Sequence, residues 1–131
     1  MIHVVDGDTI DVRIGGRNER VRLIGIDTPE TKKPNTPIEC YGPEASAFTA
    51  AILPVGTEVR LERDVVGRDD YGRLLGYVHL ADGTDTFVNH EIIARGYAVP
   101  LAIEPNTTYA GEFAAAAGRA EADDLGLWAA C

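Results

Sequence analysis

An alternating segment near the N-terminus constrains the possible folds more than any other feature of this sequence. Over residues 9–14, apolar side chains alternate with polar ones, which is the period of a half-buried β-strand. Gly15-Gly16 follows and can adopt the positive φ of a tight turn, and a second apolar segment covers residues 21–26. The sequence therefore predicts a β-hairpin, which brings residues that precede its first strand close to residues that follow its second.

The remaining periodic segments predict a mixed α+β fold. Further strands are expected over residues 57–62, 73–80 and 86–87. Three helices are expected over residues 43–52, 89–96 and 108–123. Asn89 is the expected N-cap of the second helix. Because the strands form one block with interleaved helices and no βαβ repeat, we expect a small antiparallel barrel, with residues 1–131 sharing one core.

Composition and charge exclude several classes of protein. The chain is 45% apolar and 25% charged, which excludes a disordered tail, a collagen and a disulfide-dense mini-protein. No apolar stretch approaches the length that a membrane span requires. The formal net charge of −9 argues against broad electrostatic adhesion to nucleic acid or anionic membrane. Phosphate chemistry in this chain would therefore require a local site and a bound cation.

Two aspartates flank the predicted hairpin. Asp8 precedes its first strand and Asp27 follows its second, so the two carboxylates can converge. Carboxylates brought together repel each other unless a cation or a proton lies between them. Oxygen ligands without cysteine or histidine favour calcium or magnesium. Alternatively, both aspartates serve only to shape turns, and their spacing leaves the two interpretations open.

Two arginines favour the cation interpretation. Arg22 lies on the apolar side of its strand, so we expect it to be partly buried and to need a carboxylate or a phosphate as partner. Arg73 enters a later strand just after Tyr71, an aromatic side chain that could stack on a base. With Glu30 as a proton acceptor for water, these residues form a plausible set for cleaving phosphodiesters.

The two cysteines are 91 positions apart and have neither C-x-x-C spacing nor a nearby histidine pair, which argues against a zinc site. Two buried free thiols are one interpretation. We favour a disulfide between Cys40 and Cys131, because a terminal residue is difficult to bury. A disulfide would imply an oxidising compartment. The chain begins without a recognisable signal peptide, so the leader of an exported protein is expected to lie outside this sequence.

A series of short motifs resembles the staphylococcal nuclease (thermonuclease) family and spans nearly the whole chain in one order. The motifs are Val5-Asp6-Gly7-Asp8-Thr9, Arg22-Leu23, Asp27-Thr28-Pro29-Glu30-Thr31, Tyr41-Gly42-Pro43-Glu44-Ala45, Asp70-Tyr71-Gly72-Arg73, Pro105-Asn106-Thr107 and Gly126-Leu127-Trp128. The resemblance implies a five-stranded OB-fold β-barrel with three α-helices. It also implies a calcium-dependent nuclease that hydrolyses DNA and RNA, with single strands favoured, and leaves 3′-phosphate ends. A secreted or cell-envelope location and a monomeric state are the corresponding expectations.

The resemblance also assigns roles around one calcium ion. It implies that Asp8 and Asp27 are direct ligands, with the Thr28 carbonyl oxygen as another. Glu30 would hold or activate the attacking water.

The same resemblance assigns the substrate contacts. Arg22 and Arg73 would clamp the scissile phosphate, and Tyr71 would contact the nucleotide. Lys32 and Lys33 are expected to add further substrate contacts.

An alternative function is a catalytically inactive nuclease-like module that binds nucleic acid or a protein partner. Such a module should have lost part of the catalytic set, whereas this chain keeps Asp8, Arg22, Asp27, Glu30 and Arg73. A calcium-binding structural protein would leave both arginines unexplained. Two features depart from the family pattern. Residues 100–104 are mostly apolar where tyrosines are expected, and little of the expected first strand precedes Val5.

Overall fold

The computed structural model describes residues 1–32, 35 and 37–131, and its main element is a five-stranded sheet in the order β1-β2-β3-β6-β5. These strands are β1 (His3–Asp6), β2 (Thr9–Ile14), β3 (Arg17–Leu23), β6 (Leu74–Leu80) and β5 (Val59–Glu62). A second, two-stranded sheet joins β4 (Ile26–Asp27) to β7 (Val99–Pro100). The helices are α1 (Gly42–Ile52), α2 (Val88–Ala94), α3 (Ala110–Ala122) and α4 (Leu127–Ala130). Among the described residues, no helix is both long and apolar enough to cross a bilayer.

The predicted hairpin is present as β2 and β3, and the α+β class with a five-stranded sheet is confirmed. Thr9 pairs with Arg22 at the end of the hairpin that is remote from its turn. The expected antiparallel barrel needs two corrections. β3 pairs with β6 in parallel, and no ladder joins the edge strands β1 and β5 in the described part of the chain. The segments just before these two strands are joined at Met1, whose amino group donates to the Thr57 carbonyl oxygen (3.1 Å) and whose carbonyl oxygen accepts from the Gly56 amide (3.0 Å).

Several expected boundaries were wrong for local reasons. The short first strand, in contrast, is as expected, because β1 begins at His3 and only two of its residues precede Val5. The second arm of the hairpin ends at Leu23 rather than at residue 26, since Gly25 has a φ of 85° and redirects the chain into β4. The strand expected at residues 86–87 is a single bridge between His79 and Phe87.

The expected N-cap role of Asn89 was also wrong, because Asn89 does not cap α2. Phe87 occupies the N-cap position, and the Asn89 side chain is fully buried. Its amide group donates to the Ile24 carbonyl oxygen (2.9 Å) and accepts from the Val78 amide (2.9 Å). Asn89 therefore links the helix to β6 and to the bend between β3 and β4, and it satisfies backbone groups that burial would otherwise leave unpaired.

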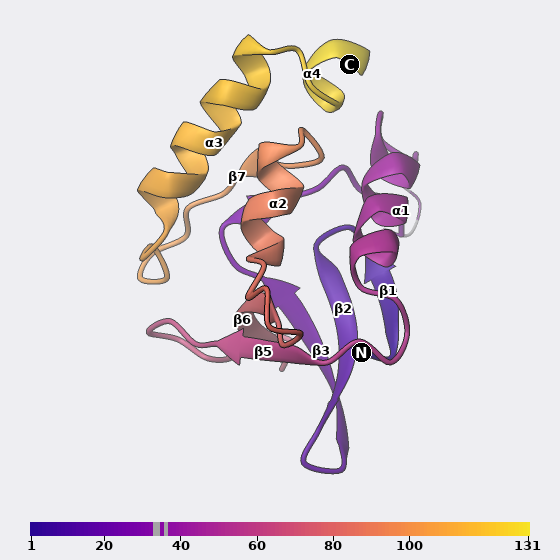
Figure 1. Ribbon diagram of the computed structural model, residues 1–131, viewed down its shortest axis with the longest axis vertical. Helices are drawn as coiled ribbons and strands as arrows, with labels where there is room; N and C mark the ends of the chain where they lie inside the picture. Colours follow the sequence, from indigo (N-terminus) through magenta and orange to yellow (C-terminus); the bar gives the residue numbers. More distant parts are fainter. Residues whose placement is uncertain (33–34, 36) are drawn as a thin grey trace.

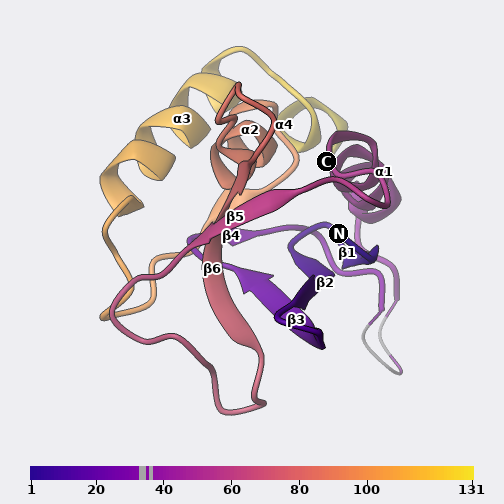
Figure 2. The same ribbon diagram turned by 60° about the horizontal axis from the view of Figure 1, so that its bottom comes forward.

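The helices gather on one side of the strands, and the turn of the β2–β3 hairpin projects away from them (Figures 1 and 2). α1 contacts β1, α2 contacts β6, and α3 contacts α2 and β7. The buried core between these elements is apolar, and its largest fully buried side chains are Tyr77, Phe113, Ile10, Leu23, Ile26, Leu53, Ile92 and Ile93.

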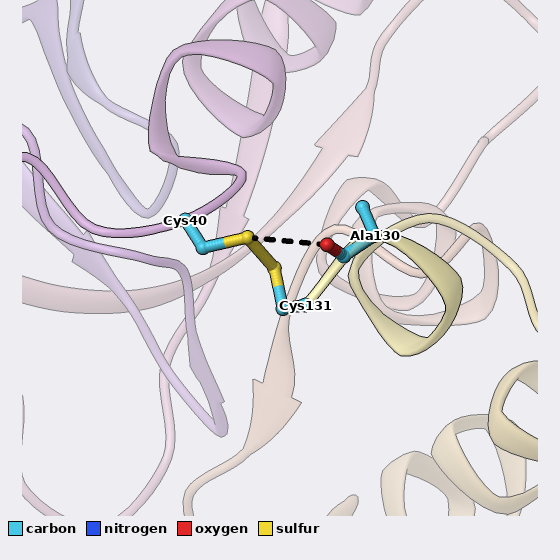
Figure 3. Close-up of a disulfide and its surroundings, with 3 residues drawn as sticks. All are labelled: Cys40, Ala130 and Cys131. Atoms are coloured by element: carbon cyan, nitrogen blue, oxygen red, sulfur yellow. Dashed lines mark hydrogen bonds between the residues drawn. A yellow bond between two sulfur atoms is a disulfide. The ribbon is translucent and has the colours of Figure 1, made fainter.

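A disulfide joins Cys40, just before α1, to Cys131, just after α4 (Figure 3). Their Cα atoms are 6.0 Å apart. The bridge closes a loop that includes α1, α2 and α3, so it limits how far the C-terminal segment can move from the start of α1.

A polar cluster connects β5 to the segment before α3. The Tyr109 hydroxyl approaches both carboxylate oxygens of Glu62 (2.7 and 2.9 Å), and His79 Nε2 lies 2.9 Å from the same carboxylate. The hydrogen bond from Tyr109 lowers the pKa of Glu62 below its ordinary value and raises the pKa of Tyr109 to about 12. The interaction therefore stabilises the fold only while Glu62 is ionised.

Replacing Tyr109 with phenylalanine should reduce the free energy of unfolding at neutral pH by about 1–2 kcal/mol, because a hydrogen bond to a charged group is lost. Since the folded pKa of Glu62 is the lower one, this stabilisation is complete above the unfolded pKa of about 4.3 and disappears as the pH falls through the folded pKa. Urea unfolding from pH 7 to pH 3 measures the effect. Glu62→Gln is the control, and an equal loss for Tyr109→Phe at every pH would contradict the prediction.

Candidate active site

Asp8 lies in the turn between β1 and β2 and is almost completely buried. One carboxylate oxygen accepts from the Thr9 hydroxyl (3.0 Å), and the other accepts from the Thr28 backbone amide (3.0 Å). The second oxygen is also 3.3 Å from Arg22 Nη2. A single side chain therefore connects the β1–β2 turn, the hairpin and the loop after β4.

Arg22 is the centre of this arrangement. Its side chain is 17% exposed, so the expected partial burial is confirmed, although Val21 and Leu23 on the other face of β3 are the residues that reach the core. Nη1 donates to the carbonyl oxygens of Leu23 (2.6 Å) and Ile26 (2.8 Å), where the chain bends from β3 into β4. Nη2 faces two carboxylates, Asp8 at 3.3 Å and Asp27 at 3.7 Å. The guanidinium group is thus fixed by the backbone while one of its nitrogens points at both acids.

The structure brings Asp8 and Asp27 to the same guanidinium nitrogen, which is the convergence that the hairpin predicted. The Asp27 side chain is 53% exposed. Burial, followed by the negative charge of Asp8, raises the pKa of Asp27 above its ordinary value. Two acids that destabilise each other's ionised form provide a place where an added positive charge is favourable.

The oxygen atoms around Asp8 and Asp27 suit a hard cation. The hydroxyl oxygen of Thr28 is buried and has no hydrogen-bond partner. In the part of the chain that the structure describes, no group of three or more His, Cys, Asp or Glu side chains could hold a metal ion. A cation at this position would therefore depend on two carboxylates, on uncharged oxygen atoms and on water.

Gly7 allows the two loops to approach each other. A Cβ atom at Gly7 would lie 2.8 Å from both Cγ2 and Oγ1 of Thr28. Real side chains do not approach so closely, so any larger residue would push Thr28, and with it the amide that Asp8 accepts from, away from the β1–β2 turn.

Glu30 lies in the loop after β4, where hydrogen bonds hold both its carboxylate and its backbone amide. One carboxylate oxygen accepts from the Lys32 amide (2.9 Å), and the Glu30 amide donates to a carboxylate oxygen of Glu39 (2.7 Å). Lys32 is exposed at the edge of the same pocket. Lys33, the other lysine predicted to contact substrate, lies outside the described residues.

Arg73 and Tyr71 approach from the turn before β6. Arg73 Nε donates to a carboxylate oxygen of Asp69 (2.6 Å), so this arginine already has one carboxylate partner. Its guanidinium carbon lies 5.6 Å from the centre of the Tyr71 ring, and the Tyr71 side chain is 86% exposed. Because β3 and β6 are parallel neighbours, with Arg22 paired to Leu75, the turn that carries Arg73 lies next to Arg22.

A pocket of about 610 Å³ collects these side chains. Its lining includes the predicted residues Asp8, Arg22, Asp27, Glu30, Lys32, Tyr71 and Arg73. Thr28 does not line this pocket; it lines a smaller cavity on the other side of the loop. An adjoining pocket of about 500 Å³ shares both arginines and Tyr71 and is lined by apolar Leu101 and Ile103.

Sequence reasoning missed two residues in this pocket, Asp6 and Arg20. Asp6 is buried and accepts from the Thr31 hydroxyl (2.8 Å), which ties the loop just after Glu30 to β1. Burial raises the pKa of Asp6. The motif Asp6-Gly7-Asp8 carried a sequence signal for Asp6, but closely spaced aspartates are common in turns. Arg20 lines the pocket wall and pairs with Asp11 (2.9 Å). No recognisable sequence signal placed Arg20 in the site.

Comparisons with known proteins identify the family of this chain. The family model described as staphylococcal nuclease homologue matches residues 20–130 of the chain. The chain is 44% identical to the thermonuclease of Staphylococcus intermedius over 125 residues, which are 95% of this chain and 72% of that protein. It is 42% identical to the thermonuclease of Staphylococcus hyicus over 128 residues, covering 98% of this chain and 73% of that protein. It is 40% identical to endonuclease YncB of Bacillus subtilis over 126 residues, covering 95% of this chain and 58% of that protein.

Replacing Gly7 with alanine should destabilise the protein by about 1–3 kcal/mol, because the new methyl group overlaps Thr28. The matched control is Gly118→Ala in α3, where nothing lies within 4 Å of an added Cβ. That variant should be more stable by about 0.5–1 kcal/mol, because alanine favours a helix over glycine. Chemical denaturation measures both free energies. A Gly7→Ala variant as stable as the parent would show that the two loops are not in close contact.

Proposed function

Because this chain belongs to the staphylococcal nuclease homologue family and is a nuclease, we propose that it hydrolyses the phosphodiester bonds of DNA and RNA with the help of one calcium ion. The observation that carries this proposal is the convergence of Asp8 and Asp27 on Arg22, in a pocket that Glu30 and Arg73 also line. Within this pocket, Asp8 and Asp27 suit a cation, Arg22 and Arg73 suit the charge of a phosphodiester, and Glu30 suits its attacking water.

Asp8 and Asp27 are the proposed calcium ligands, with the carbonyl oxygen of Thr28 as a further donor. A bound calcium ion would polarise a phosphoryl oxygen and offset the negative charge that builds up during the reaction. Asp8 is well suited to this role, because three hydrogen-bonding partners fix its orientation before any ion arrives. The excess of acidic residues in the chain makes such local charge compensation necessary.

The arginines are proposed to hold the scissile phosphate. Arg22 cannot move easily, because Nη1 is bound to two backbone carbonyl oxygens, so it offers a positive charge that needs no reorganisation. Arg73 would turn part of its guanidinium group towards the phosphate while Asp69 keeps Nε. Both groups stabilise the additional negative charge on the phosphorus oxygens in the transition state.

Glu30 is proposed to accept a proton from the attacking water. One of its carboxylate oxygens is bound by the Lys32 amide, which leaves the other available. Hydrolysis would break the bond between phosphorus and the 5′ oxygen. The water oxygen stays on phosphorus, so one product carries a 3′-phosphate and the other a 5′-hydroxyl.

Single-stranded substrates are expected to be favoured, because the exposed ring of Tyr71 can stack only on a base that is not paired. The residues of the pocket all come from one chain, and so we propose that a monomer with one domain is sufficient for activity. A secreted or cell-envelope location is proposed from the disulfide, since disulfides persist in oxidising compartments.

The purified chain should cleave single-stranded DNA when calcium is present and should stop when a chelator removes it. Gel electrophoresis of a labelled oligonucleotide measures the cleavage. The products should need phosphatase treatment before a polymerase can extend them, because their 3′ ends carry phosphate. Equal cleavage with and without chelator would overturn the calcium requirement, and products that are extended directly would overturn the bond assignment.

Replacing Glu30 with glutamine should lower kcat by about 100-fold or more, because the amide cannot accept the proton from water. The calcium affinity should change little, since Glu30 is not a proposed ligand. Glu44→Gln is the matched control, because Glu44 is an exposed glutamate in the first turn of α1 and does not line the pocket. An unchanged kcat in the Glu30 variant would exclude it as the proton acceptor.

A further inference from the structure

The segment from Glu39 to Gly42 lies directly behind Glu30, and we infer that Glu39 and the Cys40–Cys131 disulfide together position Glu30 for catalysis. This inference rests on the proposed function for the role of Glu30. It adds a positioning residue and a covalent brace, neither of which contacts substrate. The position of the Glu30 backbone then depends on the side chain of Glu39, nine residues away, and on the disulfide to the C-terminus.

Glu39 contacts the Glu30 backbone on both sides. Its carboxylate accepts a hydrogen bond from the Glu30 amide (2.7 Å), and its own amide donates to the Glu30 carbonyl oxygen (2.9 Å). The pair therefore forms a two-point clamp. Because the two bonds hold both polar backbone groups of Glu30, they limit the rotation of the residue and the direction in which its side chain leaves the loop.

Gly42 completes the contact between the two segments. A Cβ atom there would lie 2.7 Å from Thr31 Cγ2, 3.2 Å from the Glu30 carbonyl oxygen and 3.3 Å from the Pro29 carbonyl oxygen. The backbone before α1 is thus packed against residues 29–31 with no room for a side chain. A shift of this segment must move the loop that carries Glu30.

The disulfide attaches this segment covalently to the C-terminus, in addition to Tyr41, which stacks on Tyr97, and Gly42, the first residue of α1. Glu39 and Cys40 are exposed, so apolar burial contributes little to holding them. A cavity of about 280 Å³, lined by Asp27, Thr28, Pro29, Glu39, Cys40, Val99, Leu127 and Cys131, lies between the disulfide and the back of the loop. On this side, the disulfide and the loop are therefore not packed tightly against each other.

Cys131 itself is well anchored. It follows α4, where its amide donates to the Leu127 carbonyl oxygen (3.0 Å). The Leu127 amide donates in turn to the carbonyl oxygen of Gly96, at the end of α2 (2.8 Å). The path from the buried helix α2 to Glu30 therefore runs through α4, the disulfide that Figure 3 shows, and Glu39.

Both cysteines are exposed, so a dithiol can reach the bridge. Reduction breaks the S–S bond and leaves two thiols. Dithiothreitol supplies the two electrons and two protons and becomes a cyclic disulfide. We expect reduction to lower kcat several-fold at a temperature where the protein stays folded, because Glu30 loses its fixed orientation while Asp8, Asp27 and Arg22 keep their contacts with the sheet.

The first test measures how much the Glu39 carboxylate contributes to kcat. Glu39→Ala should lower kcat by about 10- to 100-fold through loss of alignment, while KM and calcium affinity change little. Glu39→Gln should keep most of kcat, because its amide oxygen can still accept from the Glu30 amide. Glu44→Ala is the control, an exposed glutamate of the same helix region. An Ala variant with the kcat of the parent, or a Gln variant as slow as the Ala variant, would overturn the role of Glu39.

The second test concerns the disulfide. The Cys40→Ser/Cys131→Ser double variant should match the reduced parent in kcat and should not respond to dithiothreitol. In the Glu39→Ala background, reduction should cause little further loss, because both changes release the same residue. Two results would overturn the role of the disulfide. One is that reduction lowers kcat as much in the Glu39→Ala variant as in the parent, and the other is an unchanged kcat after mass spectrometry has confirmed complete reduction.

A third measurement does not depend on activity. Hydrogen exchange of the Glu30 amide should accelerate in Glu39→Ala and after reduction, and should stay slow in Glu39→Gln. If the parent chain fails to cleave nucleic acid with calcium, the proposed function fails, whereas the exchange data still decide whether Glu39 and the disulfide hold Glu30. If exchange is unchanged in all variants, the clamp itself is refuted even when the chain is an active nuclease.

Discussion

The position of the Arg22 guanidinium group is the constraint on which the rest of the site depends. Two backbone carbonyl oxygens at the bend between β3 and β4 hold one of its nitrogens, and Asp8 and Asp27 face another. A charged group that is mostly buried is tolerated only with such partners. The same contacts that make Arg22 acceptable inside the fold therefore bring the two acids together and aim a positive charge into the pocket.

The site combines a rigid part and a braced part. Asp8 and Arg22 belong to the turn and strand of the central sheet, whose side chains pack into the core. Glu30 belongs to a loop that is partly exposed, and the carboxylates of Asp6 and Glu39 hold this loop at two points by accepting hydrogen bonds from it. Groups that must be aligned within a fraction of an ångström are usually supported by such neighbours. Exposed loops gain this support from specific polar contacts and covalent links because they bury little apolar surface.

Sequence reasoning predicted most elements, and its errors have identifiable causes. The alternation over residues 9–14 and the Gly15-Gly16 turn led correctly to the hairpin. The position of Arg22 on its strand led correctly to its partial burial. Asn89 was assigned to a helix cap because its residue type favours caps, whereas the core needed its amide to pair with strands. The assignment of catalytic and metal-binding roles stays a prediction, since geometry places the side chains but does not measure what they do.

The sequence by itself determined the periodic elements, the placement of Asp8 and Asp27 at the same end of a hairpin, and the available set of acids and arginines. Those properties follow from local spacing, which sets the face and the end of an element where a side chain lies. Only the tertiary structure decided that β6 lies parallel to β3 beside Arg22, that Arg73 donates to Asp69, and that the Glu30 amide donates to Glu39. The contacts of β6 and Glu39 depend on packing between segments that are separated in the sequence, and the contact between Asp69 and Arg73 depends on the path of one turn. No local periodicity encodes either kind of contact.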